Sequence, residues 1–106
     1  MQEQTAIIYN VTTKVAHSIA DKWLQWMKEE YISRMLETGC FTKATILRMI
    51  EVDETEGLTY AVQYASSGKE EYNLFIERHS ERMSRIALSK WGADIISFRS
   101  VLKVVD

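Results

Sequence analysis

The sequence predicts an α+β domain with a four-stranded antiparallel sheet and two helices packed on one face of it. The hydrophobic periods follow the order strand, helix, strand, strand, helix, strand, and this β-α-β-β-α-β order is that of ferredoxin-like domains. A short polar segment, residues 53–57, separates the two middle strands and is typical of a hairpin loop. We expect the second face of such a sheet to need a partner, a ligand or polar cover.

The first strand is predicted over residues 5–11, where β-branched and aromatic residues alternate with others. Thr12 and Thr13 are suited to cap a helix over residues 14–37. Gly39 is suited to end that helix, because glycine adopts the left-handed conformation of a helix C-terminus.

The middle of the chain predicts two strands, over residues 41–52 and 58–65. Ser67 and Glu70 form a capping-box pattern at the start of a second helix that continues to about residue 90. A last strand is predicted over residues 95–105. The chain contains no proline, repeat or linker-like stretch, so nothing subdivides it.

The composition of the chain disfavours several classes of function. The 106 residues are enough for a single domain spanning 1–106. Thirteen basic and fifteen acidic residues give a net charge of −2, so we expect no nucleic-acid partner. One cysteine and two distant histidines predict neither a disulfide framework nor a metal site, and we expect no cofactor. No basic, apolar leader or long apolar run is present, so we expect a cytoplasmic protein with no membrane partner.

Several motifs together resemble a known family. They are Tyr9-Asn10-Val11-Thr12, Trp23-Leu24-Gln25-Trp26-Met27-Lys28, Thr38-Gly39-x-Phe41, Tyr60-x-x-Gln63-Tyr64, Trp91-Gly92 and Phe98-Arg99. In this order and spacing the chain is similar to the bacterial family called domain of unknown function 4286, found largely in Bacteroidota. The family often has His-Ile-Pro where this chain has Tyr31-Ile32-Ser33. The resemblance implies a topology similar to dimeric α/β barrel proteins, whose sheets meet face to face, and implies no activity.

Polar residues on the strands supply the first candidate site. Strand periodicity and the strand order 4-1-3-2 predict that Asn10, Gln63 and Arg99 share the open face of the sheet. An arginine and two amides can hold an anionic or carbonyl-bearing ligand, or can form a polar interface in a symmetric dimer. We assign the opposite parity to the helix-packed core: Ile7, Tyr9, Val11, Leu58, Tyr60, Val62, Tyr64, Ile96, Phe98, Leu102 and Val104.

The helices supply weaker candidates. Glu30 and Arg34 lie one turn apart on the apolar face of the first helix, which suggests either a ligand-binding pair or side chains that reach water at the helix edge. His79 lies near the middle of the apolar face of the second helix. It is a candidate general acid or base, and the alternative is a hydrogen-bonded core histidine.

Two functions follow from these candidates. The first is a homodimeric domain that pairs through its open sheet face and binds a small molecule or a partner protein. The alternative is a cofactor-free enzyme, monooxygenase- or isomerase-like, of the dimeric α/β barrel kind, with His79, Asn10 and Arg99 as polar anchors. We favour the first, because the sequence shows no nucleophile–base pair, metal cluster or glycine-rich phosphate loop. An RNA-binding sheet is disfavoured, since the basic and aromatic strand motif is missing.

Overall fold

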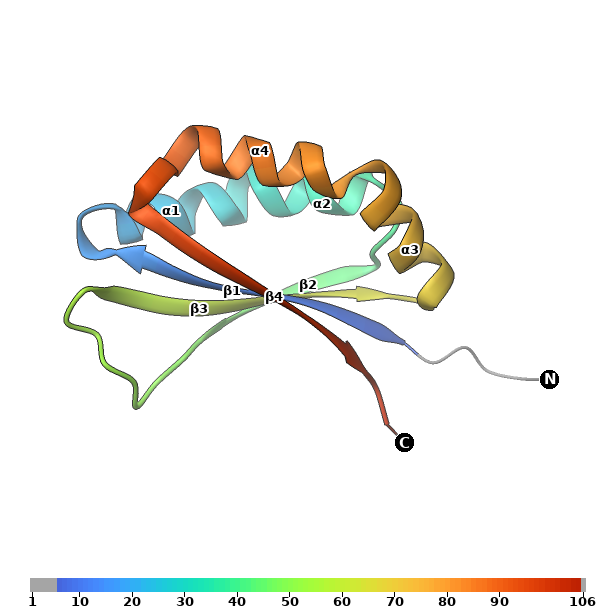
Figure 1. Ribbon diagram of the computed structural model, residues 1–106, viewed down its shortest axis with the longest axis horizontal. Coiled ribbons are helices and arrows are strands. Elements are labelled where there is room, and N and C mark those ends of the chain that lie inside the picture. The colour runs from blue at the N-terminus through green and yellow to red at the C-terminus, as the bar shows by residue number, and fades with distance from the viewer. Residues whose placement is uncertain (1–5, 106) are drawn as a thin grey trace.

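The computed structural model describes residues 6–105 and shows a four-stranded antiparallel sheet with helices on one face (Figure 1). The α+β class and the antiparallel sheet are therefore confirmed. The elements in chain order are β1 (Ile7–Ala16), the short η1 (His17–Ile19), α1 (Ala20–Trp26), the π turn η2 (Met27–Tyr31), α2 (Ile32–Glu37), β2 (Lys43–Arg48), β3 (Gly57–Ser66), α3 (Lys69–Arg78), α4 (Ser80–Trp91), η3 (Gly92–Asp94) and β4 (Ile95–Lys103).

The strands lie in the order β2-β3-β1-β4, and each neighbouring pair is antiparallel. In an antiparallel pair, opposite residues point to the same face, so the register assigns each strand side chain to a face. Gly57 lies opposite Ala16, and a Cβ at Gly57 would come within 2.3 Å of the carbonyl oxygen of Val15. Glycine is therefore required at this end of the β1–β3 pair, because a side chain there would collide with the backbone of β1.

The first strand is longer than predicted, and the first helix begins later. β1 runs to Ala16, so Thr12 and Thr13 lie inside the strand and do not cap a helix. Val15 pairs with residues of both β3 and β4 and is completely buried. The β-branched residues of this stretch favour a strand, and pairing on both sides of β1 extends it.

The first helical region contains a π turn, Met27–Tyr31, between α1 and α2. A π turn holds more residues than a regular helical turn, so it rotates the side chains that follow relative to a regular helix. Met27 is buried, whereas Glu30 and Arg34 are exposed. Both residues therefore reach water, as one of the two predicted alternatives expects, and none of the ion pairs found within residues 6–105 joins them.

The second helical region is broken at His79, whose φ of −126° is not helical, into α3 and α4. The predicted capping box does not form. Gly68, in extended conformation, precedes the first turn of α3, so Ser67 lies one position too early to cap it. The hydroxyl of Ser66 instead donates a hydrogen bond of 3.0 Å to the carbonyl oxygen of Gly68.

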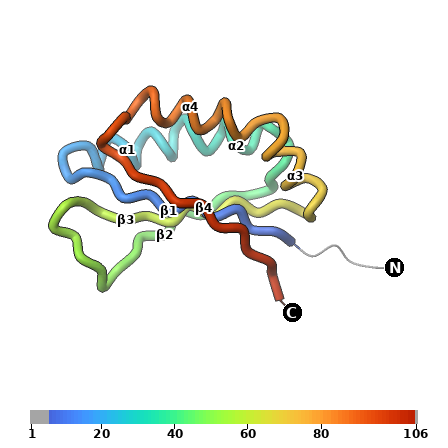
Figure 2. The backbone as a smooth tube through the Cα atoms, viewed as in Figure 1, coloured from blue at the N-terminus to red at the C-terminus, as the bar shows by residue number. Residues whose placement is uncertain are grey.

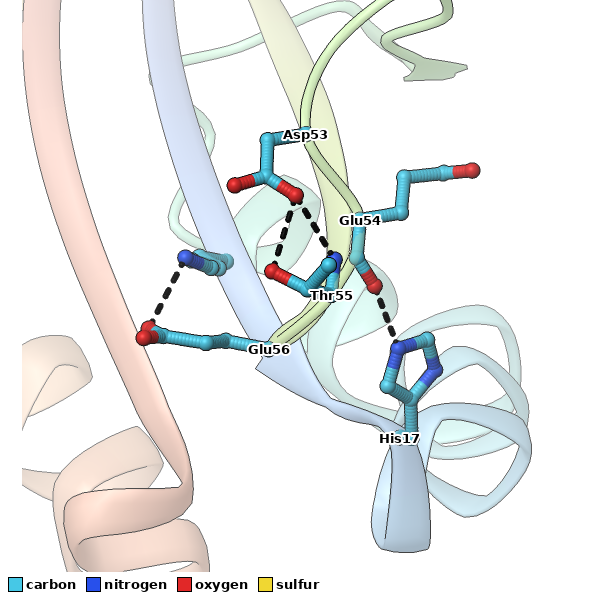
Figure 3. A network of polar contacts seen from close by, with 6 residues as sticks. His17, Asp53, Glu54, Thr55 and Glu56 are labelled. Atoms are coloured by element: carbon cyan, nitrogen blue, oxygen red, sulfur yellow. Dashed lines mark hydrogen bonds and ion pairs between the residues drawn. The ribbon is translucent and has the colours of Figure 1, made fainter.

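The loop between β2 and β3 is fastened to the end of β1 (Figure 3). His17 Nε2 lies 2.6 Å from the carbonyl oxygen of Glu54, and Lys14 Nζ lies 3.3 Å from Glu56 Oε2. β2 ends at Arg48, so the strand is shorter and the loop longer than predicted. His17 is exposed and has a structural contact here.

The helices form one layer above the sheet (Figure 2). The core between them contains many aromatic side chains. The ring of Tyr9 lies 5.3 Å from that of Phe75 and 5.9 Å from that of Phe41. Gly39 follows α2 with a φ of 78°, as its predicted left-handed conformation requires, and Cys40 after it is buried. No helix within residues 6–105 combines the length and apolar character needed to cross a membrane.

Candidate functional site

The register of β4 divides its residues between two surfaces. Arg99 lies opposite Val11 and Ser97 opposite Thr13, so both point toward the helices. Phe98 points to the other, uncovered side of the sheet. The sequence predicted the reverse for this strand. Arg99 is therefore absent from the open face, and four apolar residues assigned to the core are exposed instead: Ile96, Phe98, Leu102 and Val104.

We use "open face" for the uncovered side of the sheet. Asn10 and Gln63 lie opposite each other on it, as predicted, with Ser100 beside Asn10 and Thr45 beside Gln63. The four residues form an uncharged polar row across all four strands. The side chain of Asn10 is nearly buried and donates a hydrogen bond of 3.0 Å to the hydroxyl of Thr12.

Apolar rows flank this polar row on the open face. One row consists of Leu47, Ala61, Thr12 and Phe98, and another contains Ala65, Ile8 and Leu102. Phe98 is 68% exposed and Ile96 is 57% exposed. The charged strand residues on this face within residues 6–105 are Lys14 and Lys43. The open face is therefore largely uncharged and partly apolar.

A cavity of about 460 Å³ lies on the opposite, helix-covered side of the sheet. Residues from three parts of the fold line it: Val11, Thr13, Ser97 and Arg99 from the sheet, Trp23, Trp26, Met27 and Tyr31 from the first helical region, and Met83, Ser84 and Ala87 from α4. β4 is an edge strand and Ser97 and Arg99 are exposed, so the cavity opens to solvent along this strand. Its interior is mainly aromatic and aliphatic.

Polar groups gather where β4 faces α4. The guanidinium of Arg99 donates a hydrogen bond to the hydroxyl of Ser84. The hydroxyls of Thr13 and Ser97 are joined by a hydrogen bond of 2.9 Å. None of the ion pairs found within residues 6–105 includes Arg99. The mouth of the cavity therefore carries a positive charge whose protein partner is a neutral hydroxyl.

Three tyrosines line the cavity, of which Tyr9 and Tyr64 are buried and Tyr31 is half-buried. Burial raises the pKa of Tyr31 to about 12, and it also raises the pKa of Tyr9 and of Tyr64. The charge of Arg99 opposes the shift for Tyr9 and Tyr31, but burial is the larger effect. The hydroxyl of Tyr31 donates a hydrogen bond of 3.0 Å to the carbonyl oxygen of Met83. These phenols are neutral hydrogen-bond donors at physiological pH.

One known protein family matches this chain. A family model described as a domain of unknown function, DUF4286, matches residues 6–105. The chain belongs to the DUF4286 family. The match includes every strand and helix described above, so the open face and the cavity are both parts of the DUF4286 domain. A comparison with curated proteins gave no match. Membership of this family implies no activity, and the features of the domain that bear on function are the open face and the cavity.

The DUF4286 domain does not bring its sequence-predicted polar anchors together. His79 lies at the junction of α3 and α4, where Arg82 Nη2 donates a 3.2 Å hydrogen bond to its Nδ1. It borders a shallow depression with Arg34, away from the cavity that Arg99 lines. Asn10 lies on the open face. His79, Asn10 and Arg99 therefore belong to three separate surfaces.

Sequence reasoning missed Ser84 and Tyr31, which line the cavity of the DUF4286 domain. One signal for Ser84 was present. Ser80, Ser84 and Ala87 recur at helical spacing between charged residues, and they form a stripe of small residues on the side of α4 that faces the cavity. For Tyr31 the signal was ambiguous. It shares the apolar face of the first helical region with Trp23, Trp26 and Met27, and that pattern predicts core packing without distinguishing a cavity wall from a filled core.

Proposed function

We propose that this DUF4286 domain is a homodimeric protein that binds a small molecule, with the ligand in the cavity and the two copies joined through their open faces. The main observation that supports this proposal is the cavity. Its volume of about 460 Å³ lies within the range of ligand pockets, about 300–1,000 Å³. A mainly apolar lining with a few polar groups at one side is also the composition of such pockets.

Packing supports a ligand. Protein interiors are close-packed, with few voids larger than a water molecule. Here the rings of Trp26 and Tyr31 lie 4.8 Å apart and form one wall of the cavity. A bound molecule with an apolar body would supply the contacts that these rings lack on the cavity side.

The open face supports a second copy as the partner. Soluble monomers seldom expose large contiguous apolar patches, and here Phe98 and Ile96 are among the most exposed large apolar residues. A two-fold dimer places such a patch against itself. The polar row is suited to the same arrangement, because the amides of Asn10 and Gln63 are both donors and acceptors and can pair with their own copies. The strand order β2-β3-β1-β4 and the one-sided helical layer support a ferredoxin-like domain of the kind that pairs sheet to sheet in dimeric α/β barrels.

The alternative of a cofactor-free enzyme requires His79, Asn10 and Arg99 to converge on one substrate. They lie on three separate surfaces, so a binding domain is the function we propose.

One experiment with two readouts tests the proposal. Light scattering after gel filtration measures the mass, and the fluorescence of the neutral apolar dye N-phenylnaphthylamine measures occupancy of the cavity. We expect the native protein to bind the dye and to have twice the chain mass of 12.3 kDa. Ile96→Glu should give monomers, because two carboxylates would be buried in the interface. Ala87→Trp should fill the cavity and abolish dye binding without changing the mass.

Two control variants carry the same substitutions elsewhere. Ile76→Glu changes an exposed isoleucine of α3, and Ala93→Trp changes an exposed alanine of η3. Both should remain dimeric and bind the dye. A native protein that is monomeric refutes the dimer, and dye binding that survives Ala87→Trp refutes the cavity as the binding site.

A further inference from the structure

Resting on the proposed function, we infer that the ligand is a small carboxylic acid with an apolar, preferably aromatic, body, and that Arg99 together with Ser84 holds its carboxylate at the mouth of the cavity.

Arg99 is the first reason. A guanidinium has five N–H donors in a planar fork that matches a carboxylate, and it stays charged at any physiological pH. In this fold one arm of the fork reaches the hydroxyl of Ser84 on α4. Further donors are left over for a ligand at the mouth. A hydroxyl partner positions the guanidinium without neutralising it.

The absence of acidic groups from the lining is the second reason. The residues that line the cavity include one arginine and neither aspartate nor glutamate. The three ion pairs found within residues 6–105 use Lys14, Arg48 and Arg85, all outside the cavity. Within the cavity a ligand carboxylate would therefore meet a positive charge and no negative charge, whereas a cationic ligand would meet repulsion. Outside the mouth, Glu81 borders the depression that Ser84 and Arg99 also line, and its charge is paired with Arg85.

The distribution of polarity gives the ligand its orientation. Ser97 and Arg99 lie two positions apart on the same side of β4, opposite Ser84 of α4, and form a polar edge next to solvent. The far side is formed by Trp23 and Trp26, which are both buried. An amphipathic molecule would place its apolar body against the indole rings and its charged end at the polar edge.

The tyrosines favour the same ligand. Since burial keeps Tyr9 and Tyr31 protonated, these two phenols bring no negative charge that would oppose a carboxylate. The aromatic rings of Tyr31 and Trp26 offer a wall against which a flat ring can pack. An aromatic acid benefits both from the uncharged phenols and from the aromatic wall, whereas an aliphatic acid benefits only from the uncharged phenols.

The test compares acids with their amides, which have nearly the same shape and no charge. Phenylacetate, naphthylacetate and octanoate, each paired with its amide, are titrated against the full chain, with tryptophan fluorescence or calorimetry as the readout. We expect at least one acid to bind about tenfold or more tightly than its amide. Arg99→Gln should remove this preference while the amide binds as before, and Arg99→Lys should restore only part of it, because an ammonium lacks the fork.

Arg78→Gln is the matched control, since it removes the same charge from an exposed position of α3 that does not line the cavity. It should preserve the preference for the acid. Equal binding of acid and amide, or a preference that survives Arg99→Gln, refutes the carboxylate inference and leaves the binding function standing. Failure of every acid and amide to bind, together with failure of the neutral dye, refutes both.

Discussion

The two sides of the sheet are built from alternate residues of the same four strands, yet they differ in chemistry. The helix-covered side carries the large aromatic residues Tyr9, Tyr60 and Tyr64, and encloses the cavity. The open face carries amides, hydroxyls and exposed apolar residues such as Phe98 and Ile96, and no helix within residues 6–105 covers it. The neighbours Phe98 and Arg99 belong to different sides. A shift of one position along β4 therefore separates the proposed interface from the proposed ligand site.

The largest expected contrast between the two sides is in stability. Phe75 is 1% exposed and packs against Tyr9 and Phe41, whereas Phe98 is 68% exposed. Phe75→Ala should lower the free energy of unfolding by about 3–5 kcal/mol, because it opens a void in the core. Phe98→Ala should cost under about 1 kcal/mol when both are measured by urea unfolding in the Ile96→Glu background, which removes the interface.

The Ile96→Glu background matters because dimerisation adds to apparent stability by mass action. In the otherwise native protein, Phe98→Ala should also lower the unfolding midpoint and make it depend less steeply on concentration, because a weaker dimer contributes less to stability. Equal losses for both phenylalanines in the monomeric background would show that the open face is packed within the single chain, and would remove the contrast between the two sides.

A second contrast concerns alkaline pH. The phenol of Tyr31 ionises near pH 10 in an unfolded chain, and burial raises its pKa to about 12 in the folded protein. The folded state thus holds this proton longer, so its stabilising effect is complete below pH 10 and is lost as the pH rises toward 12. The loss for this one group is about 2–3 kcal/mol. Tyr31→Phe should make the free energy of unfolding less dependent on pH in this window.

The same phenol can be observed directly. The difference in phenolate absorbance between the native protein and Tyr31→Phe reports Tyr31 alone. Ionisation of that group near pH 10 in a chain that is still folded would contradict the buried site described for it.

The faces of the two central strands could be predicted from sequence. In β1 and β3 the two parities differ strongly in size and polarity, since Tyr9 and Tyr64 occupy one and Asn10 and Gln63 the other. Aromatic rings of this size are stable only where the helices cover them. Alternation therefore assigned both strands correctly, and it also supplied the order of strands and helices.

The faces of β4 could not be predicted in the same way. Apolar residues stand on both of its parities, and the more apolar set, with Ile96 and Phe98, points outward because the open face is itself partly apolar. A prediction that assigns the more apolar set of alternate residues to the core is wrong for such a strand. Pairing decides the question, since Arg99 lies opposite Val11.

The cavity was hidden for a related reason. A helical wheel of 100° per residue places Tyr31 on the same face as Trp23 and Trp26, and all three line the cavity. The wheel cannot show that these side chains leave a space between the helices and the sheet. Sequence periodicity thus predicts which faces meet the core, but it does not predict whether the core between them is filled.

The smallest contrast compares adjacent threonines on the two sides of β1. The hydroxyl of Thr13 is buried and shares a 2.9 Å hydrogen bond with Ser97 at the cavity, whereas the hydroxyl of Thr12 accepts from Asn10 on the open face. Thr13→Val should lower the free energy of unfolding by about 1 kcal/mol, because one partner of a part-buried hydrogen bond is lost. It should leave the mass of the dimer unchanged.

Thr12→Val should change dimerisation and leave the stability of the single chain nearly unchanged. In the Ile96→Glu background it should change stability by under about 0.5 kcal/mol, since water can replace the lost partner of Asn10. In the native dimer it frees the Asn10 amide to reorient at the centre of the interface, and the dissociation constant measured by light scattering should change severalfold. If Thr13→Val alters dimerisation and Thr12→Val alters ligand binding, the assignment of ligand binding to the helix-covered side and of dimerisation to the open face is wrong.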